Sequence, residues 1–329
     1  MAAKSNGKSS ERLALVDETQ ADRPTIEAYE LITRKLRIGR VPVLFRALAA
    51  EKALLPCWQA LRPAVRLRAF EEAADDLRAK AALAAVELGC PLIETQLEWA
   101  GYDLDEIDEI RGQVNIFHYQ NAKLLLVVAV LREALAGTAG GGKETPRATQ
   151  RVPRGVPHEM DIVELVPEDA NGSLSRLFKS IRAHLGIGVV ADEFRAFGRW
   201  PKYLAIAWDD AHKRDGESRA RGVLDDLWMQ AEAAAASLPV KVSLSDGQLS
   251  SAGADPVRIR ALVERFRRAM PGLTLDVAQF KVQLDGAEDA LDSPFPVRWK
   301  YINPDDYMPI ALDEPVKLRA GDPVGLEED

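Results

Sequence analysis

Residues 103–117 read DLDEIDEIRGQVNIF, and residues 255–266 read DPVRIRALVERF. In the first stretch Asp103 and Glu106 form a capping-box pattern, and apolar residues then recur at intervals of three and four, which predicts a helix with one apolar face. The second stretch repeats the acidic start and the apolar spacing at a constant offset of about 152 residues. The matching positions are Asp103, Ile107, Ile110 and Val114 with Asp255, Ile259, Leu262 and Phe266.

Shorter matches at nearly the same offset extend this self-similarity. Leu77 and Ala81 find Leu227 and Ala231, and the string at 45–47, Phe-Arg-Ala, recurs at 194–196. Such repetition marks a duplicated unit. We therefore predict an all-α fold of two tandem homologous helical bundles packed about a pseudo-twofold axis. Ligand sites favour such interfaces, although the two halves could also simply share a core.

Other segments also favour helices. Residues 173–185 carry an apolar stripe that Gly186 should end, and the Ala- and Leu-rich segments 66–88 and 223–238 contain strong helix formers. We expect residues 119–121 to separate a helix ending near Phe117 from a second helix over 123–135, with Asn121 as N-cap of the second. Only residues 240–244 show the alternation of apolar and polar residues that is typical of a strand, so we expect at most a minor strand content.

Composition shifts divide the chain. We expect a disordered leader over residues 1–20, a first helical repeat over 21–136, a Gly-, Pro- and Thr-rich linker over 137–157, a second repeat over 158–300 and a C-terminal extension over 301–329. Gly140, Gly141 and Gly142 should be flexible chain within the linker.

Charge and composition exclude several classes of function. The 329 residues carry 43 Lys and Arg against 51 Asp and Glu, a net charge of -8. This sign disfavours nucleic acid and anionic membranes as partners. The longest apolar run, at 124–131, is too short to span a bilayer, and two cysteines suit a reducing compartment. We expect a cytoplasmic protein.

Motifs for nucleotides and metals are missing from the sequence. It contains no phosphate-binding glycine loop, no dinucleotide fingerprint, no nucleophile elbow and no metalloprotease helix motif, and its four histidines lack metal-ligand spacing. We therefore expect no cofactor and no metal.

Two polar stretches interrupt segments that the apolar pattern predicts to be buried. One is Tyr119-Gln120-Asn121, and the other is the acidic pair Asp192 and Glu193. On spacing alone, helix capping and the ordinary preference of acids for a first helical turn explain both stretches. His118 is at most pocket lining, because a lone helical histidine is more often structural.

The chain resembles the group I 2-haloacid dehalogenases, also called halocarboxylic acid dehydrogenases, from about Thr25 to about Pro296. Three stretches carry the likeness. They are 105–126 with Tyr119-x-Asn121, Glu193-Phe194-x-Ala196 followed by Trp200-Pro201-Lys202, and Leu284-Asp285-Gly286-Ala287-Glu288 followed by Ser293-Pro294-Phe295-Pro296.

The resemblance implies hydrolysis of a carbon–halogen bond next to a carboxylate, in either enantiomer. Water attacks carbon directly, configuration is inverted and no covalent enzyme intermediate forms. Asn121 matches the family's water-holding asparagine. Glu193 matches the water-activating acid, which is Asp in the family, and the neighbouring Asp192 is the other acid that could act.

We place Tyr119, His118, Val41, Leu44 and Phe45 among the substrate-binding residues. The last three belong, with Val43, to an apolar strip that the duplication relates to the Glu193 segment. This strip is the expected wall for the alkyl part of the substrate, and ordinary bundle core is the alternative explanation for it. The expected partners are a small 2-halocarboxylic acid and water, and the resemblance suggests a homodimer. The alternative function is a non-catalytic small-acid-binding or interaction protein on the same duplicated scaffold.

Overall fold

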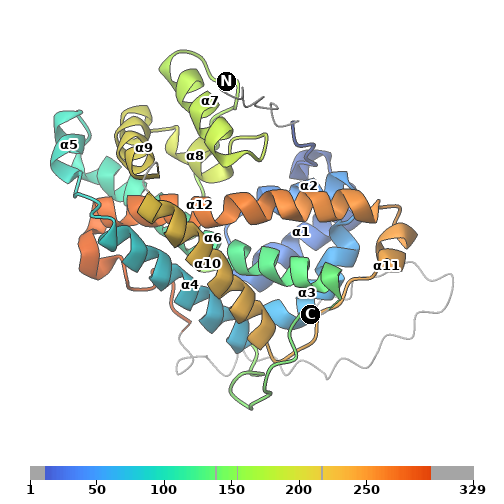
Figure 1. The fold of residues 1–329 in the computed structure, drawn as a ribbon. Helices are drawn as coiled ribbons and strands as arrows, with labels where there is room; N and C mark the ends of the chain where they lie inside the picture. Colours follow the sequence, from blue (N-terminus) through green and yellow to red (C-terminus); the bar gives the residue numbers. More distant parts are fainter. Residues whose placement is uncertain (1–11, 138, 154, 216–217, 298–329) are drawn as a thin grey trace, which may run out of the picture.

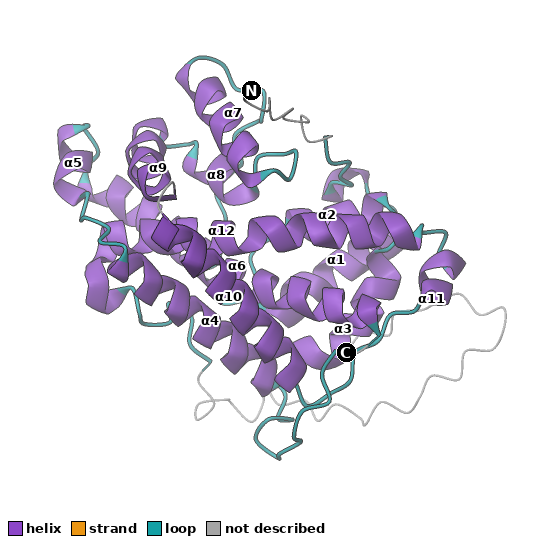
Figure 2. Ribbon diagram, viewed as in Figure 1, coloured by secondary structure: helices purple, strands orange, loops and turns teal. Residues whose placement is uncertain are grey.

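A computed structural model describes residues 12–297 apart from 138, 154 and 216–217 (Figure 1). That part of the chain contains α-helices, one short 3-10 helix and two isolated β-bridges, with no strand (Figure 2). The all-α prediction is confirmed. In chain order the elements are η1 (Glu18–Gln20), α1 (Arg23–Leu36), α2 (Val43–Ala50), α3 (Leu54–Val65), α4 (Arg68–Glu87), α5 (Glu94–Trp99), α6 (Leu104–Ala136), α7 (Ser173–Leu185), α8 (Asp192–Phe197), α9 (Pro201–Asp215), α10 (Ser218–Ser237), α11 (Asp246–Ser251) and α12 (Pro256–Asp289).

Several helices begin and end where the sequence predicts. Asp103 caps α6 through a capping box with Glu106, and Asp255 accepts a hydrogen bond from the backbone of α12. Gly186 ends α7 with a positive φ of 66°, a conformation that glycine adopts without a side-chain clash.

The two halves of the chain repeat one order of helices. Helices α1 to α6 and α7 to α12 each end in a long helix preceded by a helix of 6 residues. The long helices have 33 and 34 residues, and the second is kinked near its end at Gly286, where φ is 82°. The fourth helix of each half, α4 or α10, has 20 residues. This order agrees with the predicted duplication.

Helices α6 and α12 form the centre of the fold and share the most extensive contact between any two helices described (Figure 1). Helix α4 packs against both of them, and so does α10. Consequently one hydrophobic cluster runs through both halves. The interface between the halves is therefore the protein's main core.

Helix α6 is continuous, so the predicted break at 119–121 and the N-cap role of Asn121 are wrong. Tyr, Gln and Asn lower helix propensity by less than about 1 kcal/mol each relative to Ala, which packing readily offsets. Residues 116–131 are buried on every side, because α6 is surrounded by other helices. By length and composition α6 could cross a membrane, but 94% of its most apolar stretch is buried inside the protein.

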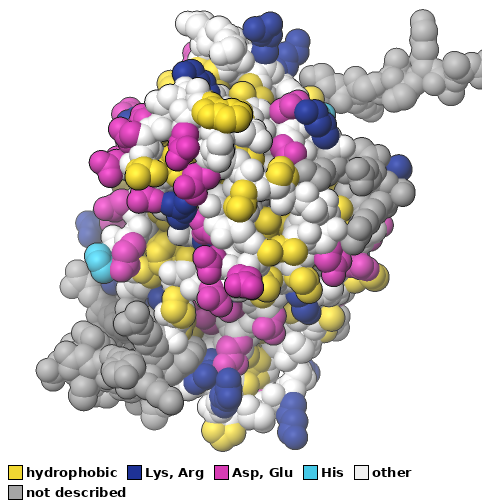
Figure 3. Space-filling view, turned by 90° about the vertical axis from the view of Figure 1, so that its left-hand side faces the viewer, with side chains coloured by type: hydrophobic (Ala, Val, Ile, Leu, Met, Phe, Trp, Pro, Cys, Tyr) yellow, Lys and Arg dark blue, Asp and Glu magenta, His cyan; other side chains and the backbone are white. Residues whose placement is uncertain are grey.

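The face drawn in Figure 3 has acidic, basic and apolar side chains interspersed over the residues described, without a continuous basic patch. A basic stripe of the kind that binds nucleic acid is not seen on this face.

Two segments expected to be loose are packed against the helices. Within the predicted leader, the Val16 N–H donates to the Arg46 carbonyl at 3.1 Å, and Tyr29 donates to the Val16 carbonyl at 2.8 Å. Gly140 lies so close to residue 240 that a Cβ would sit 1.9 Å from the Val240 carbonyl oxygen. The linker therefore begins as a tight backbone contact, and glycine is needed there. The remaining leader, residues 1–11, and the C-terminal extension lie outside the described residues.

A buried cluster of charges fixes α6 against α1 and α4. Lys123 is a buried residue, 1% exposed, and its ammonium donates to Glu71 at 2.8 Å, to the Leu36 carbonyl at 2.7 Å and to the Tyr119 hydroxyl at 2.7 Å. Arg37 donates to the same Tyr119 hydroxyl at 3.0 Å. Burial lowers the pKa of Lys123 to about 8, although Glu71 opposes this shift.

Glu71→Ala should lower the free energy of unfolding by about 3–5 kcal/mol, because it leaves the buried Lys123 ammonium without its carboxylate. The double variant Glu71→Leu with Lys123→Met should recover much of this loss, since it removes both charges. Urea unfolding measures both effects. Glu27→Ala, which breaks an exposed pair with Arg23, is the control and should cost less than about 1 kcal/mol. Equal costs for Glu71→Ala and Glu27→Ala would contradict this account.

Candidate active site

A small cavity lies where α6 and α12 meet the first turns of α2 and α8. Every residue that lines it is buried. Its volume of about 20 Å³ is enough for roughly one water molecule. The lining residues are Pro42, Val43, Leu44, Gln120, Asn121, Leu124, Ile187, Ala191, Asp192, Glu193, Phe266, Met270 and Leu273.

Asn121 on α6 and Glu193 on α8 meet in this cavity. The Asn121 Nδ2 donates to Glu193 Oε1 at 2.8 Å and to the Leu273 carbonyl at 3.2 Å. Both amide hydrogens are thus engaged, whereas Asn121 Oδ1 accepts no hydrogen bond from any residue in the described part of the chain. The pair offers a water molecule one amide oxygen and one carboxylate.

Burial changes the acidity of Glu193. Its side chain is 5% exposed, and desolvation raises its pKa from 4.5 to about 7. Hydrogen bonds from its own backbone and from Asn121 act in the opposite direction, and the charge of Asp192 adds to the rise. Glu193 therefore exchanges its proton near neutral pH.

Asp192 faces a different partner. Its Oδ2 accepts a hydrogen bond from Arg46 at 2.5 Å, and Arg46 also binds Asp17 at 2.8 Å. Burial lowers the pKa of Arg46, but the two carboxylates raise it by more, so the guanidinium stays charged. Adjacent side chains on a helix point about 100° apart, which explains how neighbouring acids reach different partners.

The cavity brings together residues at matching positions of the two halves. Asn121 touches Leu273, which lies at the offset of about 152 residues, and Glu193 faces the cavity with Leu44, at an offset of about 149. In each pair one half supplies a polar side chain and the other an apolar one. The cavity is therefore chemically asymmetric, with a polar side and an apolar side.

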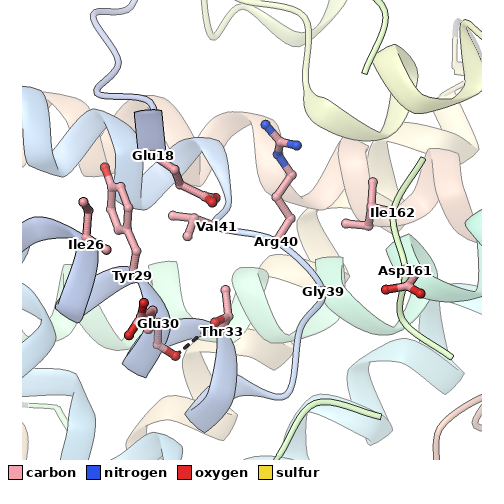
Figure 4. A pocket seen from close by; sticks show the side chains of 10 residues that line it. All are labelled: Glu18, Ile26, Tyr29, Glu30, Thr33, Gly39, Arg40, Val41, Asp161 and Ile162. Carbon is pink, nitrogen blue, oxygen red and sulfur yellow. Dashed lines mark hydrogen bonds between the residues drawn. The ribbon is translucent and has the colours of Figure 1, made fainter. Parts of the chain in front are cut away.

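The apolar strip predicted to bind substrate is divided among three places. Leu44 lines the cavity, but Val41 lines a separate cleft of about 360 Å³ with Arg40, Tyr29 and Asp161 (Figure 4). Phe45 packs edge-on against Trp58, with ring centroids 6.3 Å apart. The structure therefore brings Leu44 to Asn121 and Glu193, and Val43 of the same strip also lines the cavity, whereas Val41 and Phe45 lie elsewhere.

Tyr119 and His118 do not reach the cavity either. Tyr119 belongs to the Lys123 cluster, and His118 lies 3.3 Å from Arg78, where burial and that guanidinium lower the pKa of the imidazole well below its usual value. The physical reason is the continuity of α6. On an unbroken helix residues 120, 121 and 124 share one side, and Tyr119 points away from it.

Several residues around the pair were not predicted from the sequence. They include the cavity-lining Gln120, Phe266, Met270 and Leu273, and Arg46, the partner of Asp192. Of these residues, Leu273 could have been found from the sequence, because the repeat offset of about 152 residues maps Asn121 onto it. No group of three or more His, Cys, Asp or Glu side chains within the described ranges is arranged to hold a metal ion.

Comparison with known proteins identifies relatives of the whole described fold. An (R)-2-haloacid dehalogenase of Pseudomonas putida is 26% identical over 275 residues, spanning 82% of this chain and 91% of the relative. A configuration-inverting 2-haloacid dehalogenase of Alcaligenes xylosoxydans xylosoxydans is 29% identical over 284 residues, spanning 82% of this chain and 93% of the relative.

Solved structures agree with these sequence matches. A D-2-haloacid dehalogenase in complex with L-LA superposes with a TM-score of 0.77 at 26% identity, over 83% of this chain and 96% of that protein. The family model for halocarboxylic acid dehydrogenase DehI matches residues 39–194, a range that includes Asn121 and ends one residue after Glu193. The chain belongs to the halocarboxylic acid dehydrogenase DehI family.

Proposed function

We propose that the protein hydrolyses small 2-haloalkanoic acids to 2-hydroxy acids, by direct attack of one water molecule held by Glu193 and Asn121. The water oxygen forms a bond to carbon 2 as the carbon–halogen bond breaks. The halide leaves with the bonding electron pair, and Glu193 takes the proton. Attack opposite to the leaving halide inverts the configuration at carbon, which agrees with the configuration-inverting relatives.

One observation carries this proposal: the 2.8 Å hydrogen bond between Asn121 and Glu193 beside a cavity of single-water size. A water there donates one hydrogen to the carboxylate of Glu193 and the other to Asn121 Oδ1. Its lone pair then points away from both acceptors. Fixing water, base and carbon in one geometry removes much of the entropic barrier to the reaction.

The acidity of Glu193 suits a general base. A base works best when its pKa lies near the operating pH, and burial brings the pKa of Glu193 to about 7. Asp192 is held by Arg46 and serves as a fixed charge beside the base. We therefore assign the proton transfer to Glu193, the acid that matches the family's Asp in the resemblance described above.

Substrate binding requires the cavity to enlarge, because a haloacid is larger than the single water that fits. The apolar wall of the cavity is made of side chains that rearrange without breaking hydrogen bonds, with Leu44 on α2 and Phe266 and Met270 on α12. Met is unbranched and adapts its shape readily. Once substrate is bound, the same wall excludes bulk water from the reaction.

The non-catalytic alternative fits the site less well. A binding scaffold has no need for a buried acid whose desolvation destabilises the protein, and Glu193 is almost fully buried, beside Asn121. This geometry favours the enzyme.

Purified protein incubated with D- and L-2-chloropropionate should release chloride and form lactate of inverted configuration. Glu193→Gln and Asn121→Ala should each reduce kcat by at least about a hundredfold, since each removes one holder of the water. Halide release and chiral chromatography of the product measure this. Glu133→Gln, at the far end of α6, is the control and should retain full activity. Absence of halide release from the folded native protein with both enantiomers would contradict the proposal.

The pH profile of kcat/KM should rise through about pH 7, because Glu193 must lose its proton before it can accept one from water. In Asp192→Asn this limb should move to lower pH, since the variant removes a negative charge that raises the pKa of Glu193. Initial rates between pH 5 and 9 measure both profiles. If kcat/KM of the native protein instead rose near pH 4.5, the ordinary pKa of Glu, the base would be another group or a solvated Glu193.

Glu193→Gln should also stabilise the protein at high pH. The folded pKa is about 7 and the unfolded pKa about 4.5, so the folded state holds the proton more tightly, and stability falls as pH rises between these values. Above pH 7 the buried charge of Glu193 lowers the free energy of unfolding of the native protein by about 3 kcal/mol. The Gln variant avoids this loss because it carries no charge at residue 193. Thermal melts at pH 5 and pH 8 should show a variant advantage that is larger at pH 8. An advantage independent of pH would exclude the buried charge as its cause.

A further inference from the structure

Gln120 is a second amide in the cavity, next to Asn121 in sequence and on the same side of α6. Its side chain is 3% exposed. Its Oε1 is buried without a partner, and its amide makes no hydrogen bond with any residue in the described ranges. This differs from Asn121, whose amide is held by two acceptors.

An unsatisfied buried amide weakens a protein, so it calls for an explanation. An apolar side chain of similar length would fill the same space on α6 without this cost. Gln120 borders the space that a substrate must occupy, and its terminal amide can rotate to present Nε2 there. A bound ligand that accepts a hydrogen bond would satisfy the amide.

We infer that Gln120 is a substrate-binding residue whose Nε2 donates a hydrogen bond to the carboxylate of the 2-halocarboxylate. This inference rests on the proposed function and adds the group that recognises the acid end of the substrate. The carboxylate is charged before, during and after the reaction, so it needs a donor throughout.

The charges around the cavity explain why a neutral group, and not a cation, donates to the substrate carboxylate. No Lys or Arg is among the residues that line the cavity, and the nearby Arg46 is engaged by Asp192 and Asp17. A cation pointing into the cavity would attract the substrate carboxylate, but it would also lower the pKa of Glu193 and weaken the base. A neutral amide binds the carboxylate and leaves Glu193 basic.

The halide is the other anion that this amide could bind. The two roles differ in when the charge exists, because the halide gains its charge only as the bond breaks. A donor to the carboxylate contributes equally to binding and to the transition state, so its loss raises KM. A donor to the halide acts in the transition state, so its loss lowers kcat, and more strongly for chloride than for bromide, which leaves more easily.

The test uses Gln120→Met in the full chain, because Met has a similar length and no hydrogen-bonding group of comparable strength. For 2-chloropropionate, KM should rise roughly ten- to hundredfold with little change in kcat, and 2-bromopropionate should show the same factor. Lactate, which has the carboxylate but no halogen, should bind more weakly by that factor in calorimetry. The variant should melt no lower than the native protein.

Gln279→Met is the matched control. Gln279 on α12 is also fully buried, and its Nε2 lacks a partner although its Oε1 accepts a hydrogen bond from Cys90 Sγ at 3.6 Å; it does not line the cavity. This substitution should leave KM and lactate binding unchanged.

Three results would overturn the inference. They are unchanged KM and lactate binding in Gln120→Met, a loss in kcat that is larger for the chloro than for the bromo acid at unchanged KM, and an equal loss of lactate binding in Gln279→Met. Failure of the proposed function is a separate result, the absence of halide release by the native protein. Because lactate binding needs no turnover, the calorimetric comparison still decides the role of Gln120 in that case.

Discussion

The buried hydrogen bond between Asn121 and Glu193 is the constraint on which the site depends. It joins α6 from the first half of the chain to α8 from the second half, and it therefore exists only when the two halves pack in one register. Burial makes the carboxylate basic at neutral pH, and the amide fixes its orientation. The same burial makes the site costly in stability, so the rest of the fold must offset that cost.

The two central helices supply the rigidity. Because residues 116–131 of α6 are buried on all sides, the polar side chains in that stretch are either held by partners or face the cavity. Lys123 and Tyr119 fix one side of the helix to α1 and α4. Asn121 and Gln120 occupy another side, where α12 and the starts of α2 and α8 leave room for one water. The structural cluster and the cavity thus share one helix without sharing residues.

Local signals predicted the helices better than they predicted the site. Caps at Asp103 and Asp255 fixed two helix starts, because capping depends on neighbours in sequence. The supposed break at Asn121 was an error of the same local reasoning, since tertiary burial decides whether a helix continues. The family resemblance put Asn121 and Glu193 together. Arg46 and Gln120 were missed because their roles depend on which elements surround them, and no local pattern carries that information.

A single-turnover reaction in water enriched in heavy oxygen tests the central claim most directly, that Glu193 activates water and does not itself attack carbon. With enzyme in excess over 2-chloropropionate, mass spectrometry follows the label in lactate and in the peptide that contains Glu193. The account predicts labelled lactate from the first turnover and an unlabelled peptide. Unlabelled lactate, together with one labelled oxygen in the carboxylate of Glu193, would show a covalent ester and contradict it.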